Sequence, residues 1–554
     1  MKWLAGIGIA VLAVLGLGWL FRAEIALFGI HQMMSAEIGP TQPVTWSTGA
    51  DPQGRDASER PPNIVLILAD DLGWNDLSMN AAEDGPAAVV ETPNIDSLAA
   101  GGVTFSQGYA ANGTCAPSRA ALMSGRYGTR FGFEFTPTPP NMMSVVGLVS
   151  GTRDRPLQPP NIVNSDPNVG GLEYAEMGMP PSEITLAELL ADQGYHTVHI
   201  GKWHLGLDNG MAAHDQGFAE SLLMASGLYG RRDDDQVVQA RQEFDPIDRF
   251  LWAALNFAAS FNGGPRFEPP KYLTDYYTDE AVKVIEANKD RPFFLYLAHW
   301  APHTPLQASK EDYDALSHIE LHRERVYAAM IRSLDRGVGR VMQALKDNGL
   351  DDNTLVMFTS DNGGAGYIGL PDVNAPYRGW KITLFEGGIR VPYLARWPAK
   401  IPAGSTFDGA VHHFDMYATA AAAAGAALPS DRVMDGVDLM PHITGVDTTG
   451  AHDYLFFRSG AAQAVRDERW KLMVSAPQGG ARKEWLFDLN AEGEWQDLLA
   501  QHPDVADRLR GVLAEHNSQQ VEPRWPWTAT SAHNVDRDLS QEDQPEDEFA
   551  YWSN

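Results

Sequence analysis

Apolar residues gather in short unbroken runs along the middle of the chain. Residues 64–69, 197–200, 293–298 and 355–358 are largely apolar, show no alternation, and are each followed by polar or turn-forming residues. Such runs are typical of strands covered on both faces, as in parallel sheets. Between the last two runs, apolar side chains recur in steps of four and three from Tyr327 to Leu345. This spacing predicts an amphipathic helix that ends near Asn348-Gly349.

Alternating strands and helices predict an α/β fold, with a large mixed, mostly parallel sheet sandwiched by helices. The four runs are followed by Asp70-Asp71, by Gly201 to His204, by His299 to His303 and by Asp361 to Gly364. Ligands of such sheets bind beyond the carboxyl ends of the strands. We therefore expect all four polar clusters to lie at one edge of the sheet.

The pattern changes beyond about residue 450. Short strands separated by turns are indicated at 454–457, 464–466, 470–474 and 485–489, followed by a helix over 503–515. These elements predict a smaller C-terminal antiparallel α+β domain over 446–520, after a catalytic domain over 62–445. Residues 521–554 form an acidic tail, which we expect to be solvated and partly disordered. The inserts 141–181 and 227–270 are candidate walls that set specificity.

Charge limits the class of partner. The 554-residue chain carries a formal net charge of −30. No basic footprint for a nucleic acid is present, so no nucleic-acid partner is expected. A highly anionic polymer would also be a poor substrate unless the cleft is locally basic.

The first residues form a segment of their own. Lys2 is followed by nineteen residues without a charge, 3–21. This is about the length of a helix that spans a bilayer. We expect residues 1–35 to hold a transmembrane anchor and residues 36–61 to form a stalk. The globular part would then be extracytoplasmic, in the periplasm and anchored in the inner membrane. Secretion after cleavage of a signal segment is the alternative.

The strand ends supply candidate metal ligands. Asp70, Asp71, Asp361 and Asn362 offer hard oxygen atoms, which suit Ca²⁺ or Mg²⁺ better than Zn²⁺. Taken singly, each pair could equally be a helix cap or a turn. Two lysines, two histidines and an arginine expected at the same edge favour a site. Ca²⁺ is the better candidate because three carboxylates from two loops make a flexible cage of high coordination number.

Cys115 is the only cysteine, so it cannot form an internal disulfide. A lone cysteine is usually a small buried apolar residue, but it can also carry chemistry. The residues that follow it, from Ala116-Pro117-Ser118-Arg119 to Gly125-Arg126, resemble the signature of the formylglycine-dependent sulfatases, an arylsulfatase-like family of the alkaline phosphatase superfamily. Further matches occur in the family's order: Asn63 to Asp71, Thr92 to Asp96, Gly201 to Gly206, Ala301 to Pro305, Ser360 to Gly363 and Arg378 to Lys381. The resemblance covers about residues 62–500.

The resemblance implies hydrolysis of a sulfate monoester to an alcohol and sulfate. It implies that a separate formylglycine-generating enzyme oxidises Cys115 to an aldehyde, whose hydrate attacks sulfur and later expels sulfate by collapse. The cation would be held by Asp70, Asp71, Asp361 and Asn362, together with residue 115. The implied catalytic residues are Cys115, Arg119, Lys202, His204, His303 and Lys381. Arg119 would orient the diol and help to neutralise the site, and Lys381 and His303 would neutralise sulfate and protonate the alcohol. His204 with Lys202 would hold the diol and draw a proton from its second hydroxyl.

Other readings remain open. The same motif occurs in phosphonate and phosphate diester hydrolases, and a membrane-anchored phosphoethanolamine transferase would use Thr114 on zinc. An unmodified sulfate-binding relative would keep the thiol.

The other histidines are expected to have structural roles. His199 is expected to pack in the interior, His299 to lie behind His303, and His412-His413 to begin a helix rather than bind a second metal. The substrate is expected to be a small-molecule or saccharide sulfate ester.

Overall fold

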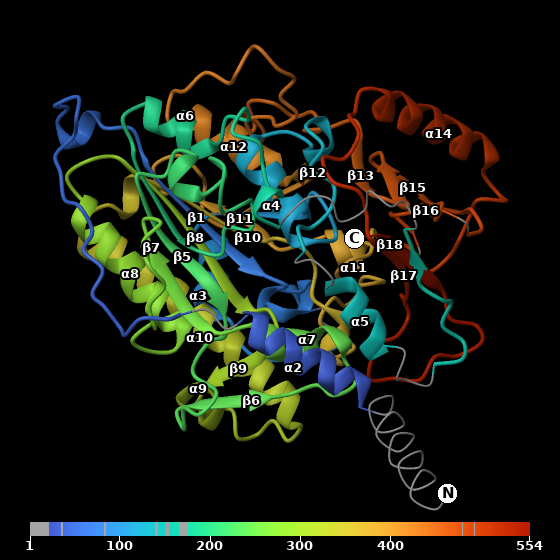
Figure 1. Ribbon diagram of the computed structural model, residues 1–554. Helices are drawn as coiled ribbons and strands as arrows, with labels where there is room; N and C mark the ends of the chain where they lie inside the picture. The colour runs from blue at the N-terminus through green and yellow to red at the C-terminus, as the bar shows by residue number, and fades with distance from the viewer. Residues whose placement is uncertain are drawn as a thin grey trace, which may run out of the picture.

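A computed structural model of the chain describes residues 21–34, 37–81, 85–138, 142–150, 155–164, 174–478, 480–491 and 493–553. Its centre is a nine-stranded sheet (Figure 1) with the strand order β12-β2-β11-β10-β1-β8-β4-β5-β7. The strands are β1 (Asn63–Asp70), β2 (Val103–Tyr109), β4 (His196–Gly201), β5 (Glu220–Gly227), β7 (Phe257–Phe261), β8 (Phe293–Pro302), β10 (Thr354–Ser360), β11 (Tyr393–Arg396) and β12 (Ser405–His412).

The four predicted apolar runs are neighbouring parallel strands. β1 pairs in parallel with β10 on one side and with β8 on the other, and β4 continues the parallel order beyond β8. Antiparallel pairing is confined to β11, between β10 and β2, and to β7 at the edge. The prediction of a mixed, mostly parallel sheet is therefore confirmed.

Helices cover both faces of this sheet. The α-helices of the described residues are α2 (Arg22–Met34), α3 (Pro93–Ala100), α4 (Cys115–Ser124), α5 (Met142–Ser150), α6 (Leu186–Asp192), α7 (Pro246–Ala254), α8 (Leu273–Asn288), α9 (Lys310–Ala315), α10 (His322–Asp347), α11 (Glu386–Ile389), α12 (His413–Ala423), α13 (Met440–Ile443) and α14 (Pro503–Ser518). Val65 and Ile67 of β1 join the core under α3, α8 and α10, whereas Leu66 and Leu68 join the core under α4, α6 and α12. Burial on both faces explains why the strand sequences show no alternation.

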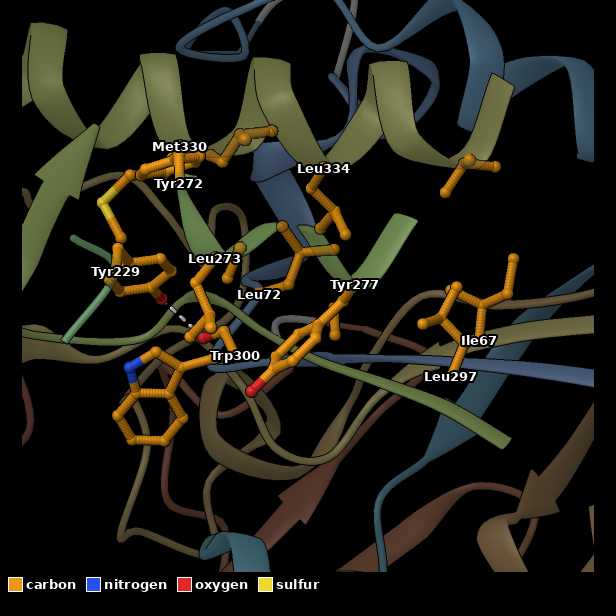
Figure 2. Close-up of a cluster of buried hydrophobic side chains, with 14 of the residues drawn as sticks. Ile67, Leu72, Tyr229, Tyr272, Leu273, Tyr277, Leu297, Trp300, Met330 and Leu334 are labelled. Carbon is orange, nitrogen blue, oxygen red and sulfur yellow. Dashed lines mark hydrogen bonds between the residues drawn. The ribbon is translucent and has the colours of Figure 1, made fainter. Parts of the chain in front are cut away.

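Helix α10 lies along one face, as its apolar spacing predicts. The predicted stripe from Tyr327 to Leu345 is buried throughout. Figure 2 shows Met330 of this helix above Tyr229 and Leu334 above Leu72, with Ile67 and Leu297 of the sheet to the right of them. The same core holds Trp300, at the carboxyl end of β8, so this packing reaches the functional edge of the sheet.

A second, antiparallel sheet follows in sequence. It has the order β13 (Leu455–Ser459), β14 (Ala462–Arg466), β15 (Trp470–Ser475), β16 (Lys483–Asp488). Helix α14 packs on it through Ala506, Leu509 and Leu513. These are the strands and the helix that the C-terminal pattern predicts. A two-stranded sheet pairs β6 (Val237–Ala240) with β9 (Leu306–Ser309).

The acidic C-terminus is ordered over 521–553, so the expectation of a partly disordered end is wrong for these residues. They form β17 (Ala529–Asn534) and β18 (Phe549–Ser553), which pair with each other and with β3 (Ile162–Val163) of the first insert. Their acids are paired with distant bases, as in Asp536 with Arg378 and Asp543 with Arg155. These ion pairs offset the repulsion that composition alone suggests.

The predicted anchor, residues 3–21, lies outside the described residues except for Phe21. Within the ranges that are described, no helix combines the length and the apolar character needed to cross a bilayer. Helix α2 packs by Ile30 against Phe250 and Ala254 of α7 and Val146 of α5.

Candidate active site

The carboxyl ends of β1, β4, β8 and β10 bring the predicted residues together. Asp70 is the last residue of β1, Lys202 follows β4, His303 follows β8, and Asp361 and Asn362 follow β10. All five side chains are more than nine-tenths buried. The prediction that these four polar clusters share one edge of the sheet is confirmed.

A buried guanidinium joins the carboxylates of two strands. Arg119 donates from its NH2 nitrogen to Asp70 Oδ2 and from Nε to Asp361 Oδ2, each at 2.8 Å, and from NH1 to the Lys202 carbonyl at 2.7 Å. The side chain has no exposed surface. Arg119 was expected to orient the diol, but these nitrogens already have acceptors. Its position fits the neutralising part of its expected role: it holds Asp70, Asp361 and the Lys202 backbone in fixed relation.

Two lysines complete the balance of charge. Lys202 Nζ lies 2.7 Å from Asp70 Oδ2, and Lys381 Nζ lies 2.6 Å from Asp71 Oδ1. Asp71 also accepts bonds from the Asn362 amide and from the Tyr367 hydroxyl, at 2.8 and 3.1 Å. Its φ of +62° is a conformation that non-glycine residues rarely adopt. The surrounding contacts keep Asp71 turned toward the site despite this strain.

Cys115 is the first residue of α4 and is 5% exposed. Its sulfur lies within 4.8 Å of ligand atoms of Asp70, Asp71 and His303, in a group able to hold a metal ion. Burial raises the pKa of the Cys115 thiol above its usual value, although Lys202 and Lys381 oppose the shift. The unmodified side chain is therefore held as a thiol rather than a thiolate.

An irregularity at the end of β8 places His303. Leu68 pairs with Ala298, but Asp70 pairs with Pro302, so two steps along β1 match four along β8. The extra residues turn the chain back toward Asp71, which lies 3.5 Å from His303 Nε2. His303 Nδ1 is 2.5 Å from the Thr304 carbonyl. Since a carbonyl only accepts, this bond fixes the proton on Nδ1 and directs Nε2 to the site.

Trp300 supports both His303 and Lys202. Its ring stacks on the imidazole of His303 with centroids 3.8 Å apart, and Lys202 Nζ lies 4.5 Å from the centre of the same ring. Figure 2 shows Tyr229 beside Trp300, where the tyrosine hydroxyl donates to the Trp300 carbonyl at 2.7 Å. Sequence reasoning left out both Trp300 and Tyr229, because neither follows a recognisable pattern.

Burial and neighbouring charges shift the pKa values of the carboxyl and imidazole groups at the site. Burial and the neighbouring Asp361 carboxylate raise the pKa of Asp70. Burial alone would also raise the pKa of Asp361, but Arg119 and the two lysines hold it below its usual value. Burial, reinforced by the nearby lysines, lowers the pKa of His204 and of His303 well below the usual range. Both imidazoles are therefore neutral near pH 7.

The residues present fit a divalent cation. Among the described residues, Asp70 Oδ1 and Asn362 Oδ1 are buried oxygen atoms with no hydrogen-bond partner. Buried oxygen atoms of this kind are costly unless something satisfies them. Together with Asp71 and Asp361 they offer the oxygen-rich ligand set that Ca²⁺ and Mg²⁺ prefer. His303 lies in a group of possible ligand atoms with Asp70, Asp71 and Cys115. The sequence predicts His303 as a catalytic residue and not as a ligand, because strand spacing does not reveal the turn after β8.

The other histidines divide as expected, with one difference. His199 is buried, with Nδ1 2.9 Å from the Ser221 hydroxyl, and His412 caps α12 with Asp415. His299 lies within β8 rather than in the following loop, and neither of its ring nitrogens has a partner among the described residues. His413 Nε2 lies 3.0 Å from the Ser360 carbonyl, behind Asp361.

Comparison with known proteins agrees with this geometry. The family profile Sulfatase matches residues 62–426. N-acetylgalactosamine-6-sulfatase of Canis lupus familiaris is 33% identical over 425 residues, covering 76% of this chain and 72% of the relative. Steryl-sulfatase of Mus musculus is 33% identical over 494 residues, covering 77% and 73%.

Solved structures show the same relationship. The crystal structure of Ps i-CgsB in complex with k-i-k-neocarrahexaose superposes with a TM-score of 0.66 at 31% identity, covering 84% of this chain and 95% of that one. The putative sulfatase yidJ from Bacteroides fragilis superposes with a TM-score of 0.60 at 20% identity, covering 85% and 98%, a likeness of fold. The chain therefore belongs to the sulfatase family and is a sulfuric ester hydrolase.

Proposed function

We propose that the protein hydrolyses a sulfate monoester with a formylglycine made from Cys115 and a divalent cation held by Asp70, Asp71, Asp361 and Asn362. One observation carries the proposal: the side chain of residue 115 begins α4 and points into a group of ligand atoms from Asp70, Asp71 and His303. The proposed nucleophile and the proposed cation site would thus share one buried volume.

We favour Ca²⁺ over Mg²⁺ as the cation. Three carboxylates and an amide from two loops give a flexible set of oxygen ligands, which suits Ca²⁺ better than the strict octahedron of Mg²⁺. When bound, the cation supplies Lewis-acid stabilisation of negative charge on the transferred group. Arg119 keeps Asp70 and Asp361 in place for it, and Asn362 and Lys381 do the same for Asp71.

The proposed modification of residue 115 would suit the same chemistry. Burial keeps the unmodified thiol protonated, which makes it a poor nucleophile. The formylglycine hydrate would supply a hydroxyl to attack sulfur and a second hydroxyl whose deprotonation lets sulfate leave. Maturation would then require a formylglycine-generating enzyme as a partner.

The remaining side chains divide the work by position. Lys381, beside Asp71, would neutralise the sulfate oxygens and deliver a proton to the departing alcohol. His303, which the resemblance gives a share in these tasks, is neutral and carries its proton on Nδ1, so its Nε2 would face the site as a hydrogen-bond acceptor. His204, a neutral imidazole, would accept the proton from the second hydroxyl of residue 115, with Lys202 holding that hydroxyl. Trp300 limits the movement of His303 and Lys202 by packing on both.

A sulfated saccharide is the proposed substrate class. Ps i-CgsB is solved with k-i-k-neocarrahexaose and is 31% identical to this chain. A small sulfated alcohol is the other candidate, because the steryl-sulfatase relative is named for one. Release of sulfate from a panel of sulfated oligosaccharides and aryl sulfates would separate the two.

The mass of the tryptic peptide that contains residue 115 tests the mechanism directly. An aldehyde at this position is expected, and Cys115→Ala should abolish turnover while leaving the fold intact. Thr114→Ala is the matched control at the neighbouring position and should stay active, whereas a phosphoethanolamine transferase would need Thr114. Activity of Cys115→Ala near that of the wild type would refute the mechanism.

A second assay tests the reaction class. Purified protein is expected to prefer an aryl sulfate over an aryl phosphonate diester. The likeness to the phosphonate monoester hydrolase SpPMH, at 18% identity and a TM-score of 0.57, is one of fold alone. Preference for the diester would overturn the proposed sulfatase reaction.

We also propose that the enzyme lies outside the cytoplasm, anchored in the inner membrane by residues 3–21. The apolar segment ends at Phe21, directly before α2, and Phe21 and the α2 residues Ile25 and Phe28 are 49%, 58% and 66% exposed. Exposed apolar side chains spaced by four and three form a stripe that suits a lipid surface. Full-length protein should remain with membranes in high salt, and deletion of residues 1–21 should release it. Recovery of a shortened, soluble mature form would instead show cleavage and secretion.

A further inference from the structure

We propose that the C-terminal segment 529–553 positions the catalytic lysine, with Asp536 acting through Arg378 on Lys381. The inference rests on the role proposed above for Lys381. We call residues 529–553 the C-terminal clamp. Strand β17 of the clamp joins the body through β3 of the first insert, where Ala529 pairs with Val163 and Thr530 with Ile162.

The first contact of the clamp is with the loop that carries Lys381. Arg378 donates from Nε to Asp536 Oδ1 at 2.7 Å and from NH2 to Asp536 Oδ2 at 3.0 Å. NH1 of the same guanidinium lies 3.1 Å from Glu548 Oε2. Paired bonds between a guanidinium and a carboxylate fix orientation as well as distance. The Arg378 side chain is only 12% exposed, so water screens the pair weakly.

A second contact lies two residues further along the same loop. Trp380 is buried and donates from Nε1 to the carbonyl of Asn534 at 2.8 Å. The next residue is Lys381, whose backbone N–H donates to Gly364 at 3.1 Å. Lys381 is therefore held between the clamp on one side and the loop after β10 on the other.

A third contact lies next to Tyr367, which is another partner of Asp71. The Leu539 N–H donates to the carbonyl of Gly366 at 3.1 Å. Gly366 lies against the ring of Trp380, where a Cβ would come within 2.6 Å of the indole. The next residue, Tyr367, donates its hydroxyl to Asp71. The clamp thus contacts both loops that carry Lys381 and Tyr367, two of the side chains that bind Asp71.

Contacts with the first insert and within the clamp hold it in place. Arg155 of the first insert donates to Asp543 Oδ1 at 3.0 Å and to the carbonyls of Leu539 and Gln541 at 2.5 and 3.0 Å. Within the clamp, Arg537 Nε donates to both oxygen atoms of Asp547, at 2.8 and 3.0 Å. The Arg537 side chain is 33% exposed and its ion pair does not touch either active-site loop, so the contacts of Arg155 should keep the clamp ordered without it, and Arg537 offers a matched control.

The test compares Asp536→Ala with Arg537→Ala in the full-length matured enzyme. Because a displacement of about 1 Å can cost up to about 100-fold in rate, Asp536→Ala is expected to lower kcat about 10- to 100-fold with a smaller change in KM. Arg537→Ala should retain the kcat of the wild type. The double variant Asp536→Ala/Arg378→Ala should be no slower than Arg378→Ala, because both changes break one connection.

Hydrogen exchange supplies a readout that does not need turnover. Peptides covering 364–369 and 378–383 should exchange faster in Asp536→Ala and stay unchanged in Arg537→Ala. Unchanged exchange in both peptides, or equal kcat for the two variants, would overturn the clamp. Absence of sulfatase activity in the wild type would instead refute the proposed function, while the exchange comparison would still decide whether the clamp holds the loops.

Discussion

Replacement of Arg119 by methionine should destabilise the catalytic domain more than any exposed ion pair can. The change removes a buried guanidinium and leaves Asp70 and Asp361 without their 2.8 Å partner. Removing one member of a buried ion pair costs about 3–5 kcal/mol, because the other charge remains buried. Methionine keeps most of the apolar stem, so the loss reports charge and hydrogen bonding rather than a cavity.

Urea unfolding followed by near-ultraviolet circular dichroism measures this loss. With an m value of about 3 kcal/mol/M, a loss of 3–5 kcal/mol lowers the midpoint by about 1 M or somewhat more. The control is Arg510→Met, which removes an ion pair to Glu484 from a side chain that is 36% exposed. Exposed pairs contribute about 0.2–1 kcal/mol, so this midpoint should hardly move.

The urea midpoint of Arg119→Met should depend on whether the protein is unfolded in Ca²⁺ or in a chelator. Without Arg119, Asp70 and Asp361 repel each other, and a divalent cation would relieve that repulsion. Arg119→Met should therefore lose more stability in the chelator than in Ca²⁺. A midpoint for Arg119→Met no lower than that of Arg510→Met, in both conditions, would refute the view that this guanidinium holds the buried carboxylates in place.

Three further predictions concern the same site and its surroundings. Chelation should abolish sulfate release and lower the melting temperature, and Ca²⁺ at 100 times its Kd should restore about 2.7 kcal/mol; a melting temperature indifferent to chelator would contradict the cation site. Tyr367→Phe removes a hydroxyl bond to Asp71 and should lower kcat/KM by about 3- to 10-fold, since one hydrogen bond contributes about 1 kcal/mol; unchanged kinetics would exclude that support. His452 Nε2 lies 2.9 Å from a carboxylate oxygen of Asp415. Burial alone would lower the pKa of this imidazole, but Asp415 raises it. The pair therefore stabilises the fold fully below about pH 6.5, and this stabilisation is lost as the pH rises through the pKa of the folded state. The melting temperature of His452→Gln should therefore fall below wild type at about pH 6 and approach it by about pH 9, and a gap that widens with pH would reverse the assigned sign.

The positions of the strand ends could be predicted from the sequence because they depend on local pattern. Unbroken apolar runs identify buried parallel strands, and the residues after such strands share one edge. This reasoning alone predicts one shared edge of the sheet for Asp70, Lys202, His303 and Asp361. Their mutual distances required the structure, since the extra residues at the end of β8 follow no periodicity.

Support for the site came from residues that the sequence did not single out. Tyr367 and Trp300 touch Asp71 and His303, yet neither lies at a spacing that marks a site. The order of the C-terminus depends on ion pairs such as Arg378 with Asp536, which are 158 positions apart. A charge count recognises an acidic run, but it does not recognise the partners that neutralise it.

The balance of charge at the site explains how so acidic a chain can take an anionic substrate. Asp70, Asp71 and Asp361 face Arg119, Lys202 and Lys381, so with neutral histidines the side chains of the site cancel. Cancellation lets these charges be buried, because each has an opposite partner within hydrogen-bond distance. A divalent cation added to this neutral set would give the site an excess of two positive charges. The net charge of −30 lies on the whole chain, and salt screens exposed charges beyond about 8 Å, whereas a buried excess is screened little. The cation would therefore make this neutral, buried cluster attractive to an anion. Lys202 and Lys381 alone would not, because carboxylates already balance their charges.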